Sequence, residues 1–338
     1  MKGLTGNGKV VVVTGSYPPD VCGVGDYVFH LINAGNAGNW QVFVKSDWSI
    51  ANIKKYIKEI NDMNPDKLII QYPTQGYGWS FLPFILMIYF TKSMKEKCIV
   101  TYHEFSNQSF KARLCENLAL FGIKRLVVTN EYEKKAVMKY HKKLRTDVIK
   151  ICSNIPKAFS LKDISEREIH YCCFGQIRPN KGIEEYIELV KDISDEKRIL
   201  IGTIPKGFEE YGNIIITKAK KVGIMVKNDA SLEEAADLLN NCKMVVLPFP
   251  DGLSERRGSF LAAAVNGCLI CSTSGKYTPR DLRECIFIEL PSGANDIRSK
   301  LNGINTVEWE LWNKKVNDYL IKNIPQSWEQ VVEQYNSL

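Results

Sequence analysis

Short β-branched runs that alternate with amphipathic stretches of helical period are the feature that most constrains the fold of this chain. Residues 50–62, for example, have the spacing of a helix that lies on a sheet. Strands that alternate with helices in this way favour parallel βαβ units in a doubly wound α/β sheet. The strands predicted in the first half are 9–15, 41–46, 67–72, 98–103, 125–130 and 148–153.

The same pattern starts again in the second half of the chain, with helices such as 182–193 between the strands. A chain of 338 residues is long enough for two domains that each bury a core. The sequence therefore predicts two Rossmann-like domains in tandem, joined near residues 155–168. The strands predicted for the second domain are 169–175, 197–202, 213–217, 243–249 and 268–273.

Composition excludes several classes of protein. Apolar residues make up 45% of the chain and charged residues 25%, as in a soluble globular protein. The ten cysteines and four histidines do not form the clustered ligand pairs of a zinc site, so we expect buried thiols, no metal and a reducing cytoplasm. The opening residues predict a strand and a turn rather than a signal peptide. The apolar run 81–90 is too short for a membrane span and predicts a core helix, with an interfacial anchor as the alternative.

Charge is distributed unevenly along the chain. Residues 1–165 contain 23 Lys and Arg against 13 Asp and Glu, a net charge of +10, whereas residues 166–338 contain 22 against 25, a net charge of −3. A basic first half favours an anionic partner, such as a phospholipid surface or a phosphorylated acceptor. A solvated surface that only keeps the protein soluble is the alternative.

Loops that follow strands are where ligands bind in doubly wound sheets. In the loop after the first strand, Gly23 and Gly25 allow close approach of the backbone to a ligand, and Asp26 is expected to open the next helix. His103 ends the fourth strand. Its position favours a catalytic role and a structural role about equally.

Two loops of the second domain are cationic. After its first strand, Gly175 is followed by Arg178 and Lys181 at the start of a helix, a combination that suits a diphosphate. After its fourth strand, residues 251–263 place two adjacent arginines before another helix, where free backbone N–H groups also suit an anion. Solvated basic turns are the alternative. The candidate residues of this second loop are Asp251, Ser254, Glu255, Arg256, Arg257, Gly258 and Ser259.

Five motifs occur in order along the chain. They are "SYPPDVCGVGDY" (16–27), "TYHEF" (101–105), "FGQIRPNKGIEEYI" (174–187), "LPFPDGLSERRGSFLAAAVNGCLICST" (247–273) and "QSWEQVVEQY" (326–335). Together they resemble the motifs of retaining glycosyltransferases of the GT-B fold, in glycosyltransferase family 4, and the SERRGS loop is similar to that of a bacterial polysaccharide branch. The resemblance implies an acceptor-side domain over 1–165, a nucleotide-sugar domain over 166–310, a central cleft that both sheets face, and C-terminal helices over 311–338 that pack back on the first domain.

The resemblance also implies an activity, which is metal-independent transfer of a sugar from a nucleoside diphosphate sugar to an acceptor hydroxyl, with retention of configuration. It assigns His103, Lys181 and Arg178 to catalysis, and it assigns Gly23, Gly25, Gly175 and the 251–259 loop to donor binding. The expected acceptor is a lipid-linked or polysaccharide intermediate of bacterial surface glycan synthesis, with peripheral contact to an anionic membrane. No cofactor and no nucleic acid are expected.

Departures from the family pattern leave an alternative open. Gln176 stands where the family has an arginine, so Arg178 is expected to take over that role. The family's paired glutamates fall on Ser254 and Ala262, and Glu255 and Asp251 are the nearby carboxylates that would compensate. The alternative is a catalytically inactive nucleotide-binding scaffold or partner subunit. An epimerase or dehydrogenase ranks lower without a G-x-G-x-x-G loop, and a nucleic-acid binder ranks last.

Overall fold

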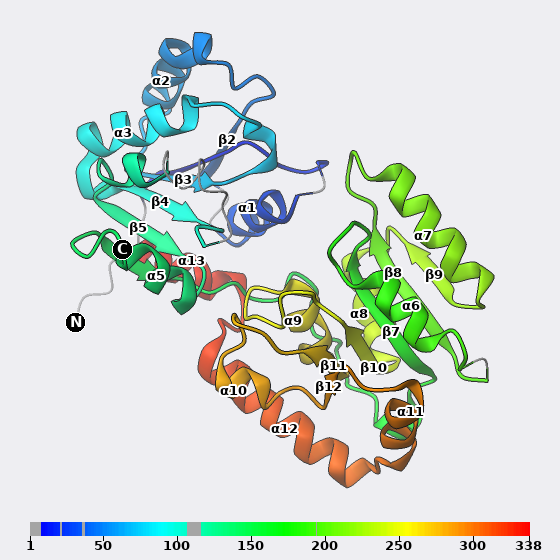
Figure 1. Ribbon diagram of the computed structural model, residues 1–338. Helices are drawn as coiled ribbons and strands as arrows, with labels where there is room; N and C mark the ends of the chain where they lie inside the picture. Colours follow the sequence, from blue (N-terminus) through cyan, green and yellow to red (C-terminus); the bar gives the residue numbers. More distant parts are fainter. Residues whose placement is uncertain (1–7, 21, 36–37, 107–115, 194) are drawn as a thin grey trace. The chain divides into compact units, whose positions relative to one another are not determined.

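The computed structural model describes residues 8–20, 22–35, 38–106, 116–193 and 195–338 (Figure 1). The chain divides into two compact units. The first unit runs to Ile151 and also contains Ser327–Leu338, and the second unit is Cys152–Gln326.

A parallel six-stranded sheet forms the centre of the first unit, with the strand order β2-β1-β3-β4-β5-β6. Its central strands are buried on both faces, as their runs of valine and isoleucine predict. The prediction for the last strand was wrong in its bounds, because 148–153 overlaps β6 only at Val148. The strands are β1 (Val10–Thr14), β2 (Trp40–Val44), β3 (Lys67–Tyr72), β4 (Cys98–Tyr102), β5 (Arg125–Val128) and β6 (Arg145–Val148).

The second unit contains another parallel six-stranded sheet, with the order β12-β11-β10-β7-β8-β9. The strand predicted at 213–217 was wrong, because these residues belong to helix α7 (Glu209–Lys221). Gly212, Ile215 and Ala219 share the buried face of that helix at helical spacing, which outweighs the β-branched run. The strands are β7 (Ile169–Gln176), β8 (Arg198–Thr203), β9 (Met225–Asn228), β10 (Cys242–Leu247), β11 (Leu269–Thr273) and β12 (Ile288–Leu290).

Helices of the first unit include the predicted core helix, whose Leu86, Met87 and Phe90 are fully buried. The last helix packs on α1, and the hydroxyl of Tyr335 lies 3.0 Å from that of Tyr27. The helices are α1 (Gly23–Ala34), α2 (Ile53–Asp62), α3 (Leu82–Met94), α5 (Glu131–Met138) and α13 (Trp328–Ser337), with short 3-10 turns η1 (Ile50–Asn52), η2 (Gln75–Tyr77) and η3 (Lys95–Lys97).

The C-terminal segment 311–338 was predicted to pack as a whole on the first domain, and the structure divides it differently. Only Ser327–Leu338 belongs to the first unit. Helix α12 belongs to the second unit, because the buried indole of Trp309 donates a hydrogen bond to the carbonyl of Gly267 at 3.0 Å. The helices of the second unit are α6 (Ile183–Val190), α7, α8 (Leu232–Asn240), α9 (Gly258–Val265), α10 (Arg280–Arg283), α11 (Ala294–Gly303) and α12 (Thr306–Asn323), with the 3-10 turn η4 (Ile164–Glu166).

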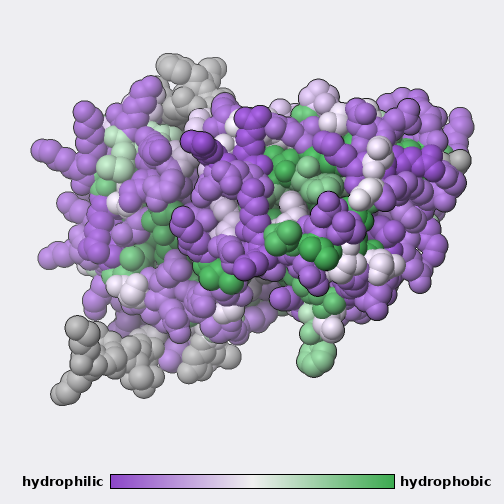
Figure 2. All heavy atoms as spheres, turned by 90° about the horizontal axis from the view of Figure 1, so that it is seen from below, coloured by the Kyte–Doolittle hydropathy of each residue, from purple (hydrophilic) through white to green (hydrophobic). Residues whose placement is uncertain are grey.

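Hydrophilic side chains cover most of the face shown in Figure 2. The apolar runs of the central strands are buried. Among the described residues, no helix has both the length and the apolar character that a membrane crossing requires. Several cysteines are buried, and burial raises the pKa of the Cys98 and Cys173 thiols to about 12. Cys115 lies outside the described residues.

Candidate functional site

The order of the strands marks one place on each sheet for a ligand. In the second unit the chain runs outward through β7, β8 and β9 and then returns to place β10 on the other side of β7 (Figure 1). The first sheet reverses in the same way between β1 and β3. In doubly wound sheets, ligands bind outside the carboxyl ends of the strands at such a reversal.

The loops after β7 and β10 meet at the reversal point of the second sheet. A Cβ added to Gly175 would lie 3.7 Å from Cβ of Ser259, so these two predicted site residues are neighbours. A Cβ added to Gly182 would lie only 2.2 Å from the carbonyl oxygen of Pro248. Gly182 also has a φ of +76°, which favours glycine. The close approach of the two loops therefore depends on glycine at the start of α6.

Helix α9 starts in this loop pair and presents its amino end there. It begins directly after Arg257, and its first turn, all of which is described, contains no acidic side chain. A Cβ added to Gly258 would have open space around it. The first backbone N–H groups of a helix have no intrahelical partner and carry partial positive charge. This end of α9 therefore suits an anion.

Four cationic side chains extend from the two loops. The Arg257 guanidinium is paired with the Asp251 carboxylate and lies 4.3 Å from the ring centroid of Phe249. The Arg178 Nε atom donates a hydrogen bond to Oε1 of Gln176 at 3.1 Å. Lys181 is partly buried just before α6. Arg178 is thus held by the glutamine that stands where the family has an arginine.

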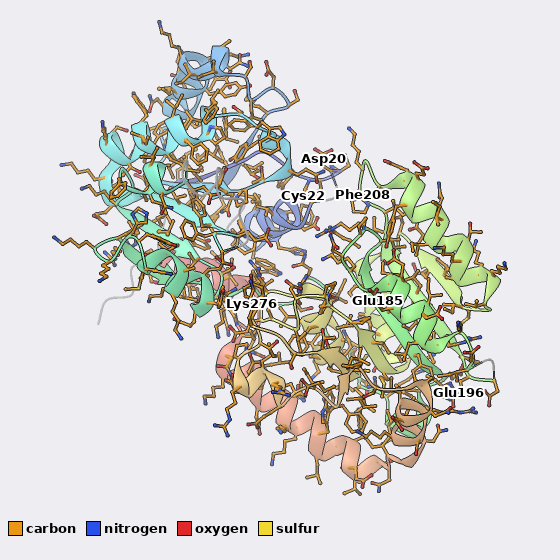
Figure 3. The ribbon with its side chains drawn as sticks, viewed as in Figure 1. Asp20, Cys22, Glu185, Glu196, Phe208 and Lys276 are labelled. Carbon is orange, nitrogen blue, oxygen red and sulfur yellow. The ribbon has the colours of Figure 1, made fainter. Side chains whose placement is uncertain are left out.

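The fourth cation, Arg256, and a lysine from a third loop, Lys276, lie near the ring of Tyr277. The Arg256 guanidinium lies 5.9 Å from the centroid of Tyr277. The ammonium of Lys276, which is labelled in Figure 3, lies 4.6 Å from the same centroid. Lys276 was not identified from the sequence, although its loop follows β11, the strand next to β10. A basic residue in the short loop that begins at Ser274, after a predicted strand, was the signal that could have found it.

Ser254 and Ala262, on which the paired glutamates of family 4 fall, are buried inside the second unit, and so is the neighbouring Glu255. Ser254 is 5% exposed and Glu255 is 7% exposed. Oε1 of Glu255 accepts a hydrogen bond from the hydroxyl of Tyr319, on α12, at 2.9 Å. Ala262 is fully buried in α9. The Glu255 side chain therefore serves at least to join its loop to α12.

His103 lies among aromatic side chains at the end of β4. Its Nε2 atom lies 2.7 Å from Oε1 of Gln71, on β3. Its ring packs edge-on against Tyr27, with 5.0 Å between centroids. Its backbone N–H donates to the carbonyl of Tyr72. These contacts hold the imidazole in one orientation.

The glycine loop after β1 differs from its prediction. Helix α1 already begins at Gly23, so Gly23 and Gly25 lie in its first turn, and Asp26 lies inside the helix instead of opening it. A Cβ added to Gly25 would lie 3.2 Å from the carbonyl of Ser16, so glycine lets the first turn pack closely on the loop after β1. Burial raises the pKa of Asp26 to about 6.

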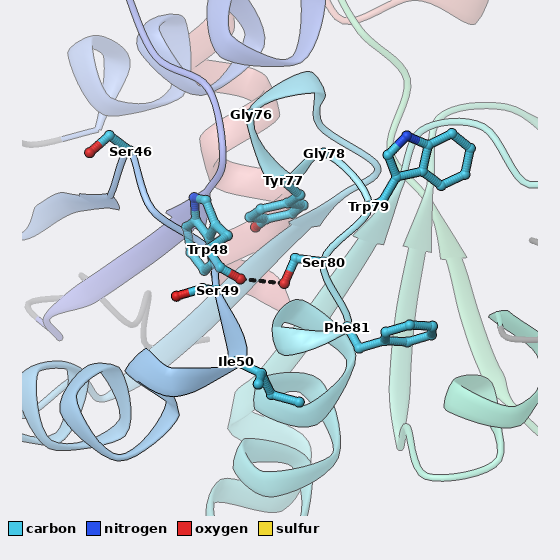
Figure 4. Close-up of a pocket in the computed structure, with 10 residues that line it drawn as sticks. All are labelled: Ser46, Trp48, Ser49, Ile50, Gly76, Tyr77, Gly78, Trp79, Ser80 and Phe81. Carbon is cyan, nitrogen blue, oxygen red and sulfur yellow. Dashed lines mark hydrogen bonds between the residues drawn. The ribbon is translucent and has the colours of Figure 1, made fainter.

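A pocket of about 430 Å³ in the first unit was not predicted from the sequence (Figure 4). It lies between the loops that follow β2 and β3, with lining residues that include Trp48, Tyr77 and Trp79. The aromatic cluster "GYGWSF" (76–81) directly after a strand was the signal that could have found it. Within the described part of the chain, no group of three or more His, Cys, Asp or Glu side chains could hold a metal ion.

Comparison with known proteins places the chain by its fold. No family model matches it, and no curated protein matches it. Among solved structures, 210 chains match it, of which three illustrate the likeness. A glycosyltransferase from Rickettsia africae ESF-5 has a TM-score of 0.68 at 11% identity, over 98% of this chain and 97% of that chain. The HepE protein of Anabaena, solved with UDP and glucose, has a TM-score of 0.67 at 14% identity, over 98% of both chains.

The third structure is the catalytic domain of starch synthase IV from Arabidopsis thaliana, bound to ADP and acarbose. It has a TM-score of 0.61 at 11% identity, over 98% of both chains. At these identities the likeness concerns the fold. The chain has the GT-B fold, with two Rossmann-like parallel sheets.

Proposed function

We propose that this chain is a glycosyltransferase of the hexosyltransferase type that moves a sugar from a nucleoside diphosphate sugar to an acceptor hydroxyl. The observation that carries the proposal is the meeting of two cationic loops at the reversal point between β7 and β10, where Gly175 adjoins Ser259. The fold is also that of a Rickettsia glycosyltransferase, of HepE, which was solved with UDP, and of starch synthase IV, which was solved with ADP.

Cleavage of the anomeric bond leaves negative charge on the departing diphosphate, so the main chemical need is to stabilise that charge. Lys181, Arg178 and the Arg256–Arg257 pair supply cations, and the amino end of α9 supplies backbone donors at Gly258 and Ser259. Asp251 holds the Arg257 guanidinium in place through its ion pair. With this set of donors, departure of the diphosphate needs no metal ion in the proposed reaction.

The resemblance to family 4 supports the finer steps of the proposal. His103 contacts the donor sugar and stabilises positive charge on its ring, and Gly23 and Gly25 let the backbone approach the pyrophosphate. The acceptor hydroxyl attacks from the face that the leaving group vacates, and the leaving phosphate takes its proton, so configuration is retained. The basic first half of the sequence and the resemblance of the SERRGS loop to a bacterial branch favour a lipid-linked or polysaccharide acceptor at an anionic membrane.

A thermal-shift screen against UDP, GDP, dTDP, ADP and CMP tests the proposal. One nucleoside diphosphate should raise the melting temperature by several degrees, because a ligand that binds only the folded state stabilises it. Hydrolysis of the matching nucleotide sugar should follow. A shift with dTDP alone would account for Ala262, since deoxyribose lacks the 2′-hydroxyl that a glutamate would hold. NAD and an oligonucleotide serve as negative controls for a dehydrogenase and a nucleic-acid binder.

An inactive nucleotide-binding scaffold is the second candidate. It is favoured by Ser254 and Ala262 in place of the paired glutamates, and by the engagement of Glu255 with Tyr319. A clear shift with a diphosphate, without either hydrolysis or transfer of any of its sugars, would select this candidate. If the wild-type chain turns over its donor and Lys181→Ala abolishes this activity, the inactive scaffold is rejected.

A further inference from the structure

The pocket between the β2 and β3 loops lies where the first sheet reverses. Strands β2 and β3 flank β1, and the reversal occurs between β1 and β3. The backbone N–H of Gly76 donates to the hydroxyl of Ser16, in the loop after β1, at 2.8 Å. The volume of about 430 Å³ falls within the range of about 300–1,000 Å³ that is common for small-ligand sites. Position and size therefore both point to a ligand.

Aromatic rings and hydroxyl groups supply the lining of the pocket. Trp48 and Tyr77 are buried, and their ring centroids are 4.6 Å apart. Trp79 is 97% exposed and Phe81 is 60% exposed. In Figure 4 these two exposed side chains point to the same side, away from Trp48. The hydroxyl groups come from Ser46, Ser49 and Ser80.

Charge is missing from this lining, although the surrounding domain is basic. None of the described residues that line the pocket has an ionisable acidic or basic side chain. A phosphate or a carboxylate would be bound by the lysines and arginines that this half of the sequence has in excess. A neutral lining of rings and hydroxyls matches a sugar ring, whose C–H faces stack on aromatic side chains and whose hydroxyls form hydrogen bonds.

A hydrogen bond ties the two loops to each other and so helps to fix the shape of the pocket. The Ser80 hydroxyl donates a hydrogen bond to the carbonyl of Trp48 and accepts one from the N–H of Leu82 (Figure 4). The Trp48 indole N–H donates to the carbonyl of Lys45 at 2.8 Å. A preformed site loses less entropy when it binds its ligand.

We propose that this pocket binds a neutral sugar residue of the acceptor glycan, with Trp79 as the exposed stacking ring. The inference rests on the proposed function, because it names the substrate that receives the transferred sugar. The cationic groups suited to a nucleotide belong to the second unit, so this neutral pocket is suited to a different ligand. Exposed Trp and Phe side chains also occur in proteins that insert into membrane interfaces, and the test below includes that outcome.

Binding to an array of neutral and acidic oligosaccharides that includes maltotriose, cellotriose and chitotriose tests the inference. The wild-type chain should bind at least one neutral oligosaccharide. Trp79→Ala removes the exposed ring, and Ser46→Trp fills the pocket while Trp79 stays in place. Both variants should bind that oligosaccharide at least about ten-fold more weakly. Phe121→Ala is the matched control, because Phe121 is 76% exposed in the same unit but does not line the pocket.

Other outcomes overturn the inference. The inference is wrong if the wild-type chain binds no oligosaccharide, or if neither Trp79→Ala nor Ser46→Trp weakens the binding. It is also wrong if Trp79→Ala loses binding to phosphatidylcholine–phosphatidylglycerol vesicles while its glycan binding is unchanged. The nucleotide thermal shift is measured on the same variants and should stay as in the wild type, which shows that they are folded. Trp79-dependent glycan binding without any nucleotide shift would support the pocket and reject the proposed transferase. A nucleotide shift with Trp79-independent glycan binding would reject the pocket alone.

Discussion

The carboxylate of Glu255 accepts a hydrogen bond from the hydroxyl of Tyr319 at 2.9 Å, which joins the loop after β10 to helix α12. Glu255 directly precedes the two arginines of the candidate donor site. The loop that carries those cations is therefore held by a hydrogen bond to a helix that is more than 50 residues away in the sequence. Such an anchor restricts the positions that the arginines can take.

Tyr319→Phe tests this anchor. The change removes the donor while the Glu255 carboxylate stays buried, and a buried polar group that loses a hydrogen bond costs about 1–3 kcal/mol. We expect the free energy of unfolding in urea to fall by about that amount. Tyr140→Phe is the control, since Tyr140 is 50% exposed and should change the free energy of unfolding by less than about 0.5 kcal/mol. Equal stability of the two variants would contradict the anchoring role.

Lys181→Ala should lower transfer by about 100-fold or more, because one preorganised donor to a developing negative charge contributes that much. The fold should be unchanged, since Lys181 lies in a loop and is only partly buried. Steady-state rates with the donor that the nucleotide screen identifies measure the effect. Lys191→Ala is the control, because Lys191 caps the other end of α6 and pairs with Glu188. Near-normal turnover of Lys181→Ala would remove this lysine from the mechanism.

Ala262→Glu would restore the second glutamate of the family pattern, but Ala262 is fully buried in α9. A carboxylate placed there without prepared partners should destabilise the protein by about 3 kcal/mol or more. Urea denaturation measures the loss, and Ala262→Ser is the control for a small polar change. If the glutamate variant is as stable as the wild type and gains affinity for a ribonucleoside diphosphate, then α9 can still present the family's ribose contact.

Asp26→Asn should stabilise the protein at neutral pH and leave its stability unchanged in acid. Burial raises the pKa of Asp26 to about 6, so the folded state binds this proton more tightly than the unfolded state does. The free energy of unfolding of the wild type therefore falls as pH rises from about 4 to about 6. Asparagine is neutral throughout.

We expect the Asp26→Asn variant to exceed the wild type by about 1–2 kcal/mol at pH 7, with the two converging below pH 4. Urea denaturation at several pH values measures the difference. Asp20→Asn, in the exposed loop before the helix, is the control for the same substitution at a carboxylate that is not buried. A constant difference between the Asp26→Asn variant and the wild type at every pH would show that burial of the charge is not the cause.

Tyr335→Phe should loosen the last helix from the first unit. Its hydroxyl lies 2.8 Å from that of Thr101 and 3.0 Å from that of Tyr27, and all three side chains are buried. We expect a loss of about 1–3 kcal/mol in the free energy of unfolding. A double-mutant cycle with Thr101→Val isolates the pair, and the double variant should lose less than the sum of the single variants. Additive losses would mean that the hydrogen bond contributes nothing.

The local pattern of the sequence predicted most of the strands, because parallel strands buried on both faces need continuous apolar runs. It failed at 213–217, because the buried residues of helix α7, Gly212, Ile215 and Ala219, recur at the spacing of a helix and not at that of a strand. It also placed the start of α1 at Asp26, because glycine has a low helix propensity, whereas in the structure Gly25 lies in the first turn of α1 and packs on Ser16. β-branched side chains and helix ends both respond to what packs against them.

In the candidate donor site too, the sequence predicts some features, whereas others are visible only in the tertiary structure. The cations Arg178, Lys181, Arg256 and Arg257 could be found from the sequence, because each follows a recognisable strand. The Glu255–Tyr319 contact and the pocket beside Trp48 could not, because their partners come from separate segments that only the packed sheet and helices bring together. The sequence by itself determined the two α/β sheets and the charge of the loops at their strand ends. Only the tertiary structure decided which loops meet, because that depends on strand order and on close backbone approach at glycine.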